Sequence, residues 1–473
     1  MNQWANQGRD LHLDLDSGRG VRDGLEQALR QAVRSGRLAP GSRLPSSRAL
    51  AQDLGIARNT VSDAYSQLVA EGWLTARQGA GTRVSQATFA EFGHATSTSG
   101  LEAPHDPADL GGAPSYPYDL RPGLPDLSSF PREAWLAASR RALTIAPREA
   151  LGYTDPRGRP ELREALAEYL ARVRAVRTAP GLIVVCSGFA QAIGLLGRAL
   201  VGMGGRRIAV EALGLPNAQA ILRDAGLEPV ELPVDADGVC VDHLTGESAL
   251  LFTPSHQFPT GAALPPARRG AAIAWARERG AVIVEDDYDG EFRYDRQPVG
   301  AVQGLAPTHV AYGGTASKSL APGLRLGWLV LPPHLIEPVV REKQLADRHT
   351  SVLDQLTLAE FITSGAYDRH VRRMRARYRR RRDLLVAAVA RDASHVRVTG
   401  IAAGLHAVLA LPEDGPSEAE VIDRAQQHGL GLTGMASFGK DTSRRALVVG
   451  YATPSGHAFA GALQRLCAVL GTG

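Results

Sequence analysis

Lysine is almost missing from this chain of 473 residues. Of the 53 lysine and arginine side chains, only three are lysine: Lys318, Lys343 and Lys440. An arginine stays protonated under ordinary conditions and cannot act as a nucleophilic amine, whereas a deprotonated lysine can condense with an aldehyde. Lys318 stands between two serines in the stretch GGTASKSLAPGLRLGW. A composition that prefers arginine nearly everywhere but keeps a lysine here makes Lys318 a candidate for amine chemistry.

Cysteine and long apolar segments are also scarce. The three cysteines, Cys186, Cys240 and Cys467, are odd in number and far apart, which argues against a disulfide framework and against a metal site. No run of about 18 apolar residues could span a bilayer. The first residues, MNQWANQGRDLHLD, carry charges where a signal peptide has an apolar core. We therefore expect a cytoplasmic protein that binds no metal and does not enter a membrane.

Charge and composition divide the chain into three parts. The net charge is only +4, but ten arginines stand against five acidic residues between Arg19 and Ser85. Residues 86–117 lack apolar periodicity and are rich in Ser, Thr, Gly, Ala and Pro, which is typical of a flexible linker. We therefore predict an N-terminal domain over 1–85, a linker over 86–117 and a C-terminal domain over 118–473.

The N-terminal domain contains a helix-turn-helix spacing in the segment LPSSRALAQDLGIARNTVSDAYSQLVAEGWL. It predicts a short helix over about 47–54, a tight turn at 55–57 and a second helix that opens with Arg58, Asn59 and Thr60. The start of this second helix is the end that meets base edges in a DNA major groove. The alternative is an ordinary small helical domain with a solvated arginine face.

A wing follows the second predicted helix. The segment WLTARQGAGTRV predicts two short strands around a Gly-Ala-Gly turn, which would lie near DNA phosphates. The longer run GRLAPGSRLPSSRALAQDLGIARNTVSDAYSQLVAEGWL resembles the winged-helix domain of the GntR regulators almost position by position. This resemblance implies contacts with double-stranded DNA from Arg48, Arg58, Asn59, Thr60, Gln78 and Gly79.

The C-terminal domain alternates strand-like and helical segments. Apolar runs such as LIVVCSG, AVIVEDD and LGWLVL are separated by segments such as PARRGAAIAWARERG. The alternation predicts an α/β fold with a parallel sheet and crossover helices. If the aldehyde that meets Lys318 is pyridoxal 5′-phosphate, the site also needs phosphate ligands, a carboxylate for the ring nitrogen and a donor to the phenolic oxygen.

Candidates for these roles stand at the ends of predicted strands. Thr315 and Arg325 flank Lys318 in one loop, where a hydroxyl and a guanidinium could share the phosphate. Free backbone N–H groups at the start of a helix form an anion site, and the residues that open the helix after LIVVC are Ser187, Gly188, Phe189 and Ala190. The sequence EDDY at 285–288 ends the strand AVIV, at the sheet edge where ligands of open α/β sheets bind.

The motifs of the C-terminal domain together resemble those of fold-type I aminotransferases: DLRPGLPDLSSFPREAW, LGYTDPRGRPELREALAEYL, TPSHQFPTG, EDDYDGEFRY and HVRRMRARYRRRRDLL. Joined to a GntR-like domain, they resemble the MocR family of regulators over nearly the whole chain. The resemblance implies a smaller α+β subdomain over about 355–473 and a Schiff base at Lys318. The implied cofactor contacts are Asp286, or Asp287 in its place, at the ring nitrogen, Tyr288 at the phenolic oxygen, Thr315 and Arg325 at the phosphate, and His256 beside the ring.

Two positions depart from the family's pattern. Leu215 stands where the family has an aromatic residue on the cofactor ring, so it can cover the ring only by apolar contact. Val448 stands where amino-acid-binding relatives carry an arginine that forks onto the substrate carboxylate, unless Arg444 or Arg445 takes that place. The arginine run at 369–382 is interpreted as a solvated interdomain helix rather than a second DNA surface, as charge runs usually are.

These features predict a regulator that binds DNA and senses pyridoxal phosphate at Lys318, similar to the PdxR branch, which controls vitamin B6 biosynthesis. The alternatives are a sensor of an amino acid or amine, as in the GabR and TauR branches, and a working aminotransferase with an added DNA-binding domain. Val448 weakens the first alternative, and Leu215 and Val448 both weaken the second. An inert dimerising scaffold would bind no cofactor. We expect at most residual transaminase half-reactions, and the family implies a head-to-tail homodimer with each winged helix over the partner's large domain.

Overall fold

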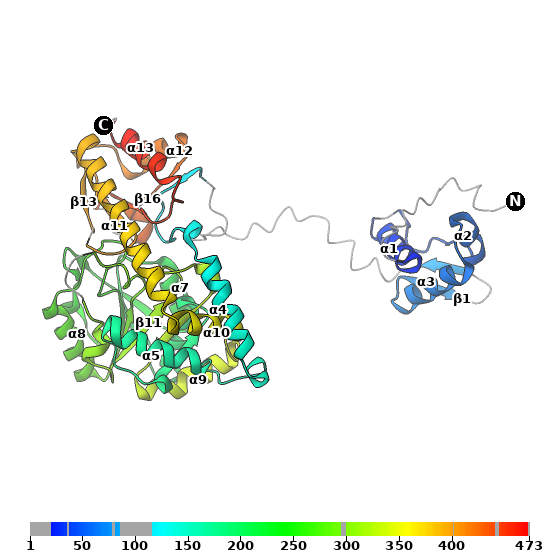
Figure 1. The fold of residues 1–473 in the computed structure, drawn as a ribbon, viewed down its shortest axis with the longest axis horizontal. Coiled ribbons are helices and arrows are strands. Elements are labelled where there is room, and N and C mark those ends of the chain that lie inside the picture. The colour runs from blue at the N-terminus through cyan, green and yellow to red at the C-terminus, as the bar shows by residue number, and fades with distance from the viewer. Residues whose placement is uncertain are drawn as a thin grey trace. The chain divides into compact units, whose positions relative to one another are not determined.

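The computed structural model describes residues 20–35, 37–77, 81–85, 116–294, 299–400, 402–439 and 444–471. The chain divides into two compact units, Met1–Asp106 and Pro107–Gly473, which we call the head and the body (Figure 1). Almost all of the predicted linker lies outside the described residues. Within the described ranges, no helix combines the length and the apolar character needed to cross a membrane.

The head confirms the predicted helix-turn-helix. Its elements are α1 (Val21–Arg34), α2 (Ser47–Leu54), α3 (Arg58–Ala70), β1 (Leu74–Arg77) and β2 (Gly81–Val84). Ser46 caps α2 by accepting a hydrogen bond from the Ala49 N–H (3.2 Å), one of the groups that a helix start leaves without a partner. Gly55 ends α2 in the left-handed conformation (φ 65°), which glycine adopts without strain.

The core of the head ties α2 and α3 together. The predicted core residues that are buried are Leu50, Val61, Tyr65 and Leu68, while Leu54 is only partly buried. The Tyr65 hydroxyl donates a hydrogen bond to the Pro45 carbonyl (3.0 Å). This bond satisfies the polar end of a buried aromatic side chain and fixes α3 against the segment before α2.

The predicted wing is also present. β1 and β2 pair antiparallel, and the buried residues Leu74 and Val84 face each other in that pair. The wing is tied to the rest of the head because the Val84 N–H donates to the Ser42 carbonyl (2.9 Å). Gln78 and Gly79, at the predicted tip, lie outside the described residues.

The body is organised around a seven-stranded sheet of order β4-β12-β11-β10-β9-β5-β6. Its strands are β4 (Ile183–Cys186), β5 (Arg207–Glu211), β6 (Glu228–Leu232), β9 (Ala249–Phe252), β10 (Val282–Asp286), β11 (Val310–Thr315) and β12 (Gly327–Val330). β12 runs antiparallel to both of its neighbours, whereas β5, β6, β9, β10 and β11 are parallel. The α/β class is confirmed, but the sheet is mixed rather than parallel.

β12 reverses direction because its connection from β11 is short. A crossover that keeps two strands parallel needs a dozen or more residues and usually a helix. Only residues 316–326 separate the two strands, and they hold Lys318 and a single 3-10 turn. Thr315 at the end of β11 pairs with Gly327 at the start of β12, so this loop is fixed at both ends.

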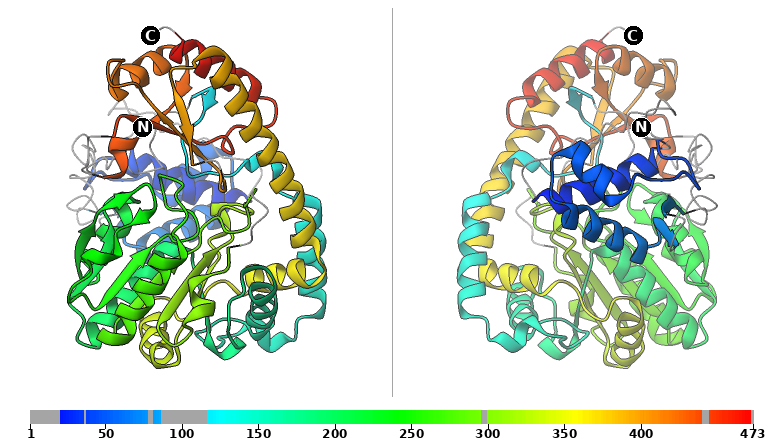
Figure 2. Two further views of the ribbon diagram at one scale, coloured as in Figure 1. Left: turned by 90° about the vertical axis from the view of Figure 1, so that its left-hand side faces the viewer. Right: turned by 90° about the vertical axis from the view of Figure 1, so that its right-hand side faces the viewer.

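Helices cover both faces of the large sheet (Figure 2). Alternate strand residues point to opposite faces, so Val184 packs in the core beneath α6, α7 and α9, whereas Val185 packs in the core beneath α5 and α10. α8 covers a further part of the second face. These helices are α5 (Pro160–Arg174), α6 (Phe189–Gly202), α7 (Pro216–Asp224), α8 (Pro266–Arg279), α9 (Pro333–Ala346) and α10 (Val352–Thr363).

A smaller four-stranded sheet follows the long helix α11 (Ala366–Asp392). It consists of β13 (Arg397–Thr399), β14 (Ala407–Ala410), β16 (Thr433–Gly434) and β17 (Ala446–Val449), and α12 (Glu418–Gln427) and α13 (Phe459–Leu470) pack on its core. β3 (Tyr118–Asp119) pairs with β15 (Leu430–Gly431) beside the same core. The beginning and the end of the body therefore meet in this smaller part.

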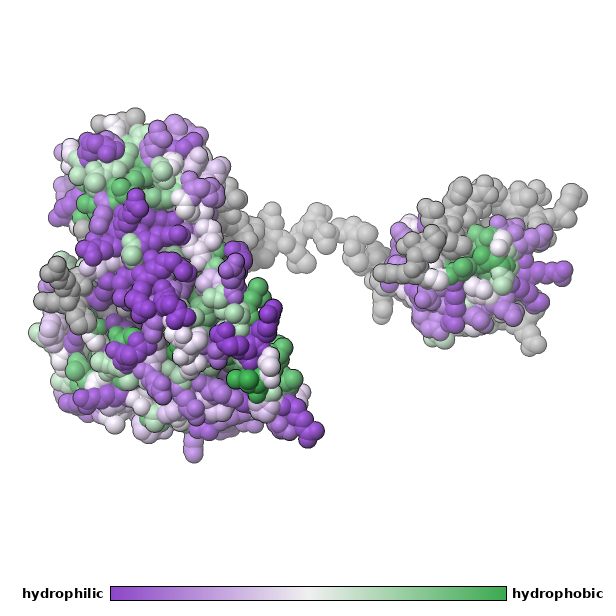
Figure 3. Space-filling view, viewed as in Figure 1, coloured by the Kyte–Doolittle hydropathy of each residue, from purple (hydrophilic) through white to green (hydrophobic). Residues whose placement is uncertain are grey.

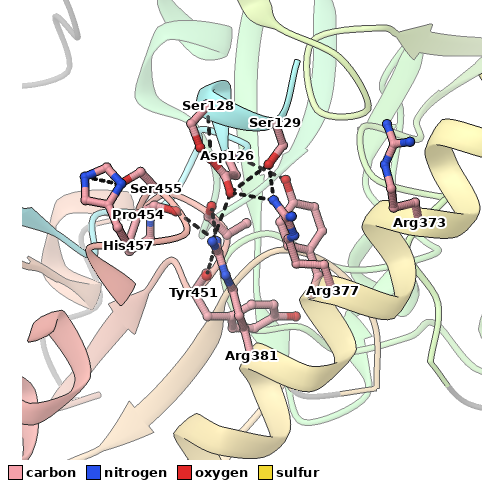
Figure 4. A network of polar contacts seen from close by, with 12 residues as sticks. Asp126, Ser128, Ser129, Arg373, Arg377, Arg381, Tyr451, Pro454, Ser455 and His457 are labelled. Carbon is pink, nitrogen blue, oxygen red and sulfur yellow. Dashed lines mark hydrogen bonds and ion pairs between the residues drawn. The ribbon is translucent and has the colours of Figure 1, made fainter. Parts of the chain in front are cut away.

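One buried carboxylate ties α11 to the segment that precedes α4 (Arg132–Ile145). The side chain of Asp126 is fully buried and accepts a hydrogen bond from Arg381 (2.9 Å) and another from Arg377 (3.3 Å), as Figure 4 shows. Burial opposes the charge on Asp126, but hydrogen bonds from Ser128 and Ser129 and the nearby guanidinium groups outweigh it and lower the pKa of this carboxyl. Arg381 is itself buried, so the expectation that the arginine run is solvated does not hold for this residue.

Asp126→Ala should lower the free energy of unfolding of the body by about 3–5 kcal/mol, because it leaves the buried Arg381 without its carboxylate. Urea unfolding of the full chain measures the change. Asp119→Ala is the matched control, since Asp119 pairs with Arg121 at a partly exposed site and should change stability by no more than about 1 kcal/mol. Equal effects of the two substitutions would contradict a special role for the Asp126 pair.

Candidate functional site

A cavity opens at the edge of the large sheet where β5, β9 and β10 end. It is lined by five of the residues predicted to hold a cofactor: Phe189, Leu215, Asp286, Tyr288 and Lys318. They lie at or just beyond strand ends, or at the start of the following helix. The carboxyl ends of parallel strands meet at one edge of a sheet, and this is why residues far apart in the chain come together here.

Lys318 is the one described lysine that faces the cavity. Its Nζ donates a hydrogen bond to the Gly123 carbonyl (2.5 Å). Burial lowers the pKa of Lys318, although Asp286 and Asp289 act in the opposite direction, so the amine loses its proton more easily than an exposed lysine does. Lys343, by contrast, is fully buried in an ion pair with Asp347 (2.7 Å). Lys440 lies outside the described residues.

The geometry distinguishes the two neighbouring carboxylates at the end of β10. Asp287 faces away from the cavity and accepts two hydrogen bonds from Arg174 (2.6 and 2.9 Å) and one from Tyr312 (2.7 Å). Asp286 lines the cavity, and its buried Oδ1 has no hydrogen-bond partner among the described residues. Burial, and next the charge on Asp287, raise the pKa of Asp286 well above its ordinary value. Asp286 is therefore the acceptor that is available to a ligand.

His256 does not line the cavity, although the sequence predicts it beside the cofactor ring. Its Nδ1 lies 3.0 Å from the Tyr288 hydroxyl and 2.8 Å from Oδ2 of Asp289. Close packing holds the ring behind Tyr288, because a Cβ on Gly404 would come within 2.1 Å of the His256 ring. His256 therefore contacts Tyr288, whose side chain faces the cavity, and its own contact with the cofactor stays a prediction.

Two further aromatic residues line the cavity. Phe258, two positions further along the same loop, lines the cavity, and so does His406 at the start of the small sheet. His406 donates from Nε2 to the Pro259 carbonyl (3.0 Å). Burial lowers the pKa of His406 to about 3, so its ring is uncharged at neutral pH.

The predicted phosphate ligands gather beside the start of α6. Gly188 has φ 85°, and a Cβ there would come within 3.0 Å of the Arg325 guanidinium, so only glycine fits. Arg325 donates to the Ser187 carbonyl (2.5 Å). The Ser187 N–H donates to the Gln191 side chain (2.7 Å), so this N–H, counted among the phosphate ligands from the sequence, is already used. The N–H groups of Gly188, Phe189 and Ala190 stand at the helix start, where no partner within the helix exists.

Thr315, the other predicted phosphate ligand, lies at the end of β11. Its hydroxyl is buried, donates to the Leu326 carbonyl (3.1 Å), lies 2.8 Å from Ser317 Oγ, and does not line the cavity. It therefore braces the loop that contains Lys318 and Arg325.

Glu211 is a cavity residue that the sequence analysis missed. It ends β5 and accepts hydrogen bonds from the Thr253 hydroxyl (2.6 Å) and the Thr253 N–H (3.2 Å). Burial raises the pKa of Glu211 to about 7. An acidic residue at the end of an apolar strand, the signal that identified residues 285–288, would also have identified Glu211. The described residues contain no group of three or more histidine, cysteine or acidic side chains placed to hold a metal ion.

Among the described residues, no arginine lines the cavity. Val448, which is predicted to stand in the place of the family's carboxylate-binding arginine, is fully buried in an apolar cluster. Arg444 donates to the Val234 carbonyl, and Arg445 donates to the carbonyls of Glu413 and Gly415. Neither alternative arginine therefore reaches the cavity, and a ligand carboxylate would find no guanidinium there.

In the head, the predicted DNA contacts lie at the start of α3 and on α2. Arg48, Arg58 and Asn59 are exposed, and Thr60 is partly buried. The side chains of Arg48, Arg58 and Asn59 make no hydrogen bond or ion pair within the described part of the head. They are therefore available to phosphates and base edges.

Comparison with known proteins identifies both units. Residues 22–84 match the gntR family of bacterial regulatory proteins, and residues 123–448 match the class I and II aminotransferase family. The rhizopine catabolism regulatory protein MocR of Rhizobium meliloti, itself described as probable, is 34% identical over 93% of this chain and 92% of its own length. The chain is a MocR-type transcriptional regulator.

Two further similarities add to this assignment. The pyridoxine biosynthesis transcriptional regulator PdxR of Corynebacterium glutamicum is 32% identical over 88% of both chains. The α-aminoadipate aminotransferase LysN of Thermus thermophilus, solved in complex with N-(5′-phosphopyridoxyl)-L-leucine, superposes with a TM-score of 0.66 at 28% identity, over 74% of this chain and 91% of its own. This MocR-type regulator therefore has a DNA-binding head of the GntR type and an aminotransferase-like body that binds pyridoxal 5′-phosphate.

The cavity fits this cofactor. Pyridoxal phosphate has a ring nitrogen that donates a hydrogen bond when protonated, and Asp286 Oδ1 is a buried acceptor without a partner in the described chain. It has a phosphate, and Arg325 and the free N–H groups at the start of α6 lie together. It has an aldehyde, and the amine of Lys318 points into the same cavity.

Asp286→Asn should weaken cofactor binding, whereas Asp287→Asn should lower the stability of the body. Asp286→Asn removes a charge-assisted hydrogen bond of about 1.5–3 kcal/mol to the cofactor, so pyridoxal phosphate should bind about 10- to 100-fold more weakly in a spectroscopic titration. Unfolding of the cofactor-free protein should not change. Asp287→Asn breaks the buried pair with Arg174 and should lower the free energy of unfolding by about 3–5 kcal/mol. If Asp287→Asn weakened cofactor binding and Asp286→Asn lowered stability, the roles of the two residues would have to be exchanged.

Proposed function

We propose that this MocR-type regulator senses pyridoxal phosphate itself and thereby controls genes of vitamin B6 biosynthesis. The observation that carries the proposal is the lack of a guanidinium in the described cavity wall. An amino-acid effector would need a clamp on its carboxylate to be held beside the cofactor, and Val448, which is buried in an apolar cluster, supplies none. The similarity to PdxR, whose name describes a regulator of pyridoxine biosynthesis, supports the same assignment.

Each of the predicted site residues, in the cavity wall or beside it, has a role in this proposal. Lys318 supplies the amine, Asp286 accepts a hydrogen bond from the ring nitrogen, and Tyr288 donates to the phenolic oxygen. Arg325 and the N–H groups of residues 188–190 bind the phosphate, with Thr315 bracing their loop. Leu215 and Phe258 cover the ring by apolar contact, while His256 positions Tyr288. When bound, pyridoxal phosphate supplies an aldehyde that can be attached covalently to an amine.

The hydrogen bond from Lys318 to Gly123 connects the cavity to the segment of the body that follows the predicted linker in sequence. Gly123 lies between β3 and the buried Asp126, in the first segment of the body after the predicted linker. Attachment of the Lys318 amine to an aldehyde would change this bond directly. Three residues further along, Asp126 pairs with Arg381 of α11. A change at Gly123 would therefore act on a segment that is attached to α11.

The head residues Arg48, Arg58, Asn59 and Thr60 are proposed to contact operator DNA, together with Gln78 and Gly79 of the wing. We also propose a cytoplasmic location, because operator DNA lies there; recovery of the protein in a membrane fraction would contradict this.

A working aminotransferase remains the second candidate, since Lys318 and Asp286 occupy one cavity in the arrangement that such chemistry needs. Turnover with a panel of amino and keto acids distinguishes it from a sensor. Sustained multiple turnovers with any pair would favour the enzyme, whereas single half-reactions at most are expected.

Lys318→Ala should abolish the visible absorption band that forms when the protein is incubated with pyridoxal phosphate. In the wild type, borohydride reduction and mass mapping should find the cofactor fixed to the peptide that contains Lys318. The cofactor should also lose its effect on the binding of promoter DNA in this variant, while binding without cofactor is retained. If pyridoxal phosphate altered DNA binding equally in the variant and the wild type, covalent sensing would be wrong.

We propose that the body forms a homodimer through the surface around α4. Leu136, Leu143 and Ile145 are 65%, 53% and 75% exposed, and the exposed Leu151 and Tyr153 follow shortly after them. Hydrophobic residues gather along the edge of the body where α4 runs (Figure 3). Large apolar side chains exposed together are typical of a protein interface, and a second copy of the chain is the partner that a homodimer supplies.

The substitutions Leu136→Glu and Leu143→Glu, made together, should convert the dimer to monomers in analytical ultracentrifugation. Two buried charges without partners would raise the dissociation constant by at least about 100-fold. Leu305→Glu is the control, because Leu305 is 61% exposed at a different place in the body. A monomeric wild type, or a dimer that survives the double substitution, would rule out this interface.

A further inference from the structure

The arginines of α11 divide between two sides of the helix. Arg377 and Arg381 turn toward Asp126 and are held there by ion pairs, as Figure 4 shows. Arg375 donates to the Glu291 carbonyl (2.7 Å). These three side chains have structural partners, and their positive charges are used within the body.

Arg372, Arg379 and Arg380, which we call the α11 arginine row, lie on another side of the same helix. All three are exposed, and their side chains make no hydrogen bond or ion pair within the described residues. They line an open groove together with Arg293 and Arg375. Strongly hydrophilic residues dominate this face of the body around α11 (Figure 3).

The groove holds almost no compensating negative charge. Asp383 is the acidic residue in its wall, and Arg382 already binds it (2.6 Å) while stacking on the ring of Tyr294 (4.8 Å). Like charges this close repel one another, and a concave surface of one sign concentrates its field. A ligand with several regularly spaced negative charges would relieve the repulsion among these arginines. A single small anion would neutralise only part of their positive charge.

The row extends along the helix and therefore suits an extended polyanion such as a nucleic-acid backbone. Arg372 and Arg379 are seven residues apart, which places them about 10 Å apart along the helix axis. Guanidinium groups bind phosphates through two parallel hydrogen bonds, and most contacts between proteins and DNA go to the backbone without reading its sequence. The chain already carries a DNA-binding head, so DNA is the polyanion that this protein meets.

We propose that the α11 arginine row is a second DNA-binding surface, which contacts the phosphate backbone of double-stranded DNA without base specificity. This inference rests on DNA binding by the head. It assigns to the body a direct contact with DNA in addition to cofactor sensing, and it replaces the expectation that the whole run is merely solvated.

The test compares full-length variants by fluorescence anisotropy with a labelled DNA duplex of mixed sequence. Arg372→Ala and Arg379→Ala are made together. The matched control is Arg277→Ala with Arg279→Ala, which removes the same charge from two exposed arginines of α8 that have no partner in the described chain. Titrations between about 50 and 200 mM salt give the slope of log affinity against log salt. The visible band with pyridoxal phosphate checks that each body is folded.

The row variant should show a slope reduced by about 2, close to one for each lost phosphate contact, while the control keeps the wild-type slope. The Arg58→Ala variant should keep a residual affinity for DNA that comes from the row. This residual binding should disappear when Arg372→Ala and Arg379→Ala are added. Equal slopes for the row variant and the control would overturn the proposal. So would a row variant that binds DNA normally but loses binding to phosphatidylglycerol vesicles, because the surface would then be a membrane contact.

The same series separates this inference from the function on which it rests. If the wild type binds the duplex and Arg58→Ala weakens it, DNA binding by the head stands whatever the row variant does. If the wild type binds no DNA at all, both fail together.

Discussion

The guanidinium of Arg174 lies buried between Asp287, the Ser255 hydroxyl and the Val299 carbonyl, and it donates a hydrogen bond to each of them. A buried carboxylate is stable only when its charge is matched and its oxygens are hydrogen-bonded. Because Arg174 and Tyr312 satisfy Asp287 completely, the adjacent Asp286 can point into the cavity without any such partner. The unpaired oxygen of Asp286 in the cavity therefore depends on the ion pair that Asp287 forms on the other side of the strand.

Much of the architecture could be predicted because its signals are local. The helix-turn-helix rests on Gly55 and on the spacing between two short helices, which a single segment of sequence contains in full. Lys318 stands out by composition alone. The antiparallel direction of β12 was not predicted, because an apolar run does not show in which direction its strand runs. The short connection through residues 316–326 could have indicated it, since it is too short for a usual crossover between parallel strands.

The finer details of the cavity depend on contacts between distant residues, and this is why the sequence left them open. Asp286 and Asp287 look equivalent until Arg174 is placed beside one of them. His256 and Phe258 stand two positions apart in one loop, but Phe258 lines the cavity whereas the His256 ring packs closely against Gly404. Arg381 reads as part of a solvated charge run, and only the buried Asp126 accounts for its burial.

The loop between β11 and β12 has a kinetic consequence. Both of its ends are fixed in the sheet, Thr315 braces its interior, and Arg325 is packed on Gly188. The amine and the guanidinium are thus held in place before any ligand arrives, and a preorganised site loses little conformational entropy on binding. Binding of the cofactor would then need no slow rearrangement of this loop, and the lifetime of the bound state, rather than the rate of encounter, would set the concentration at which the regulator responds.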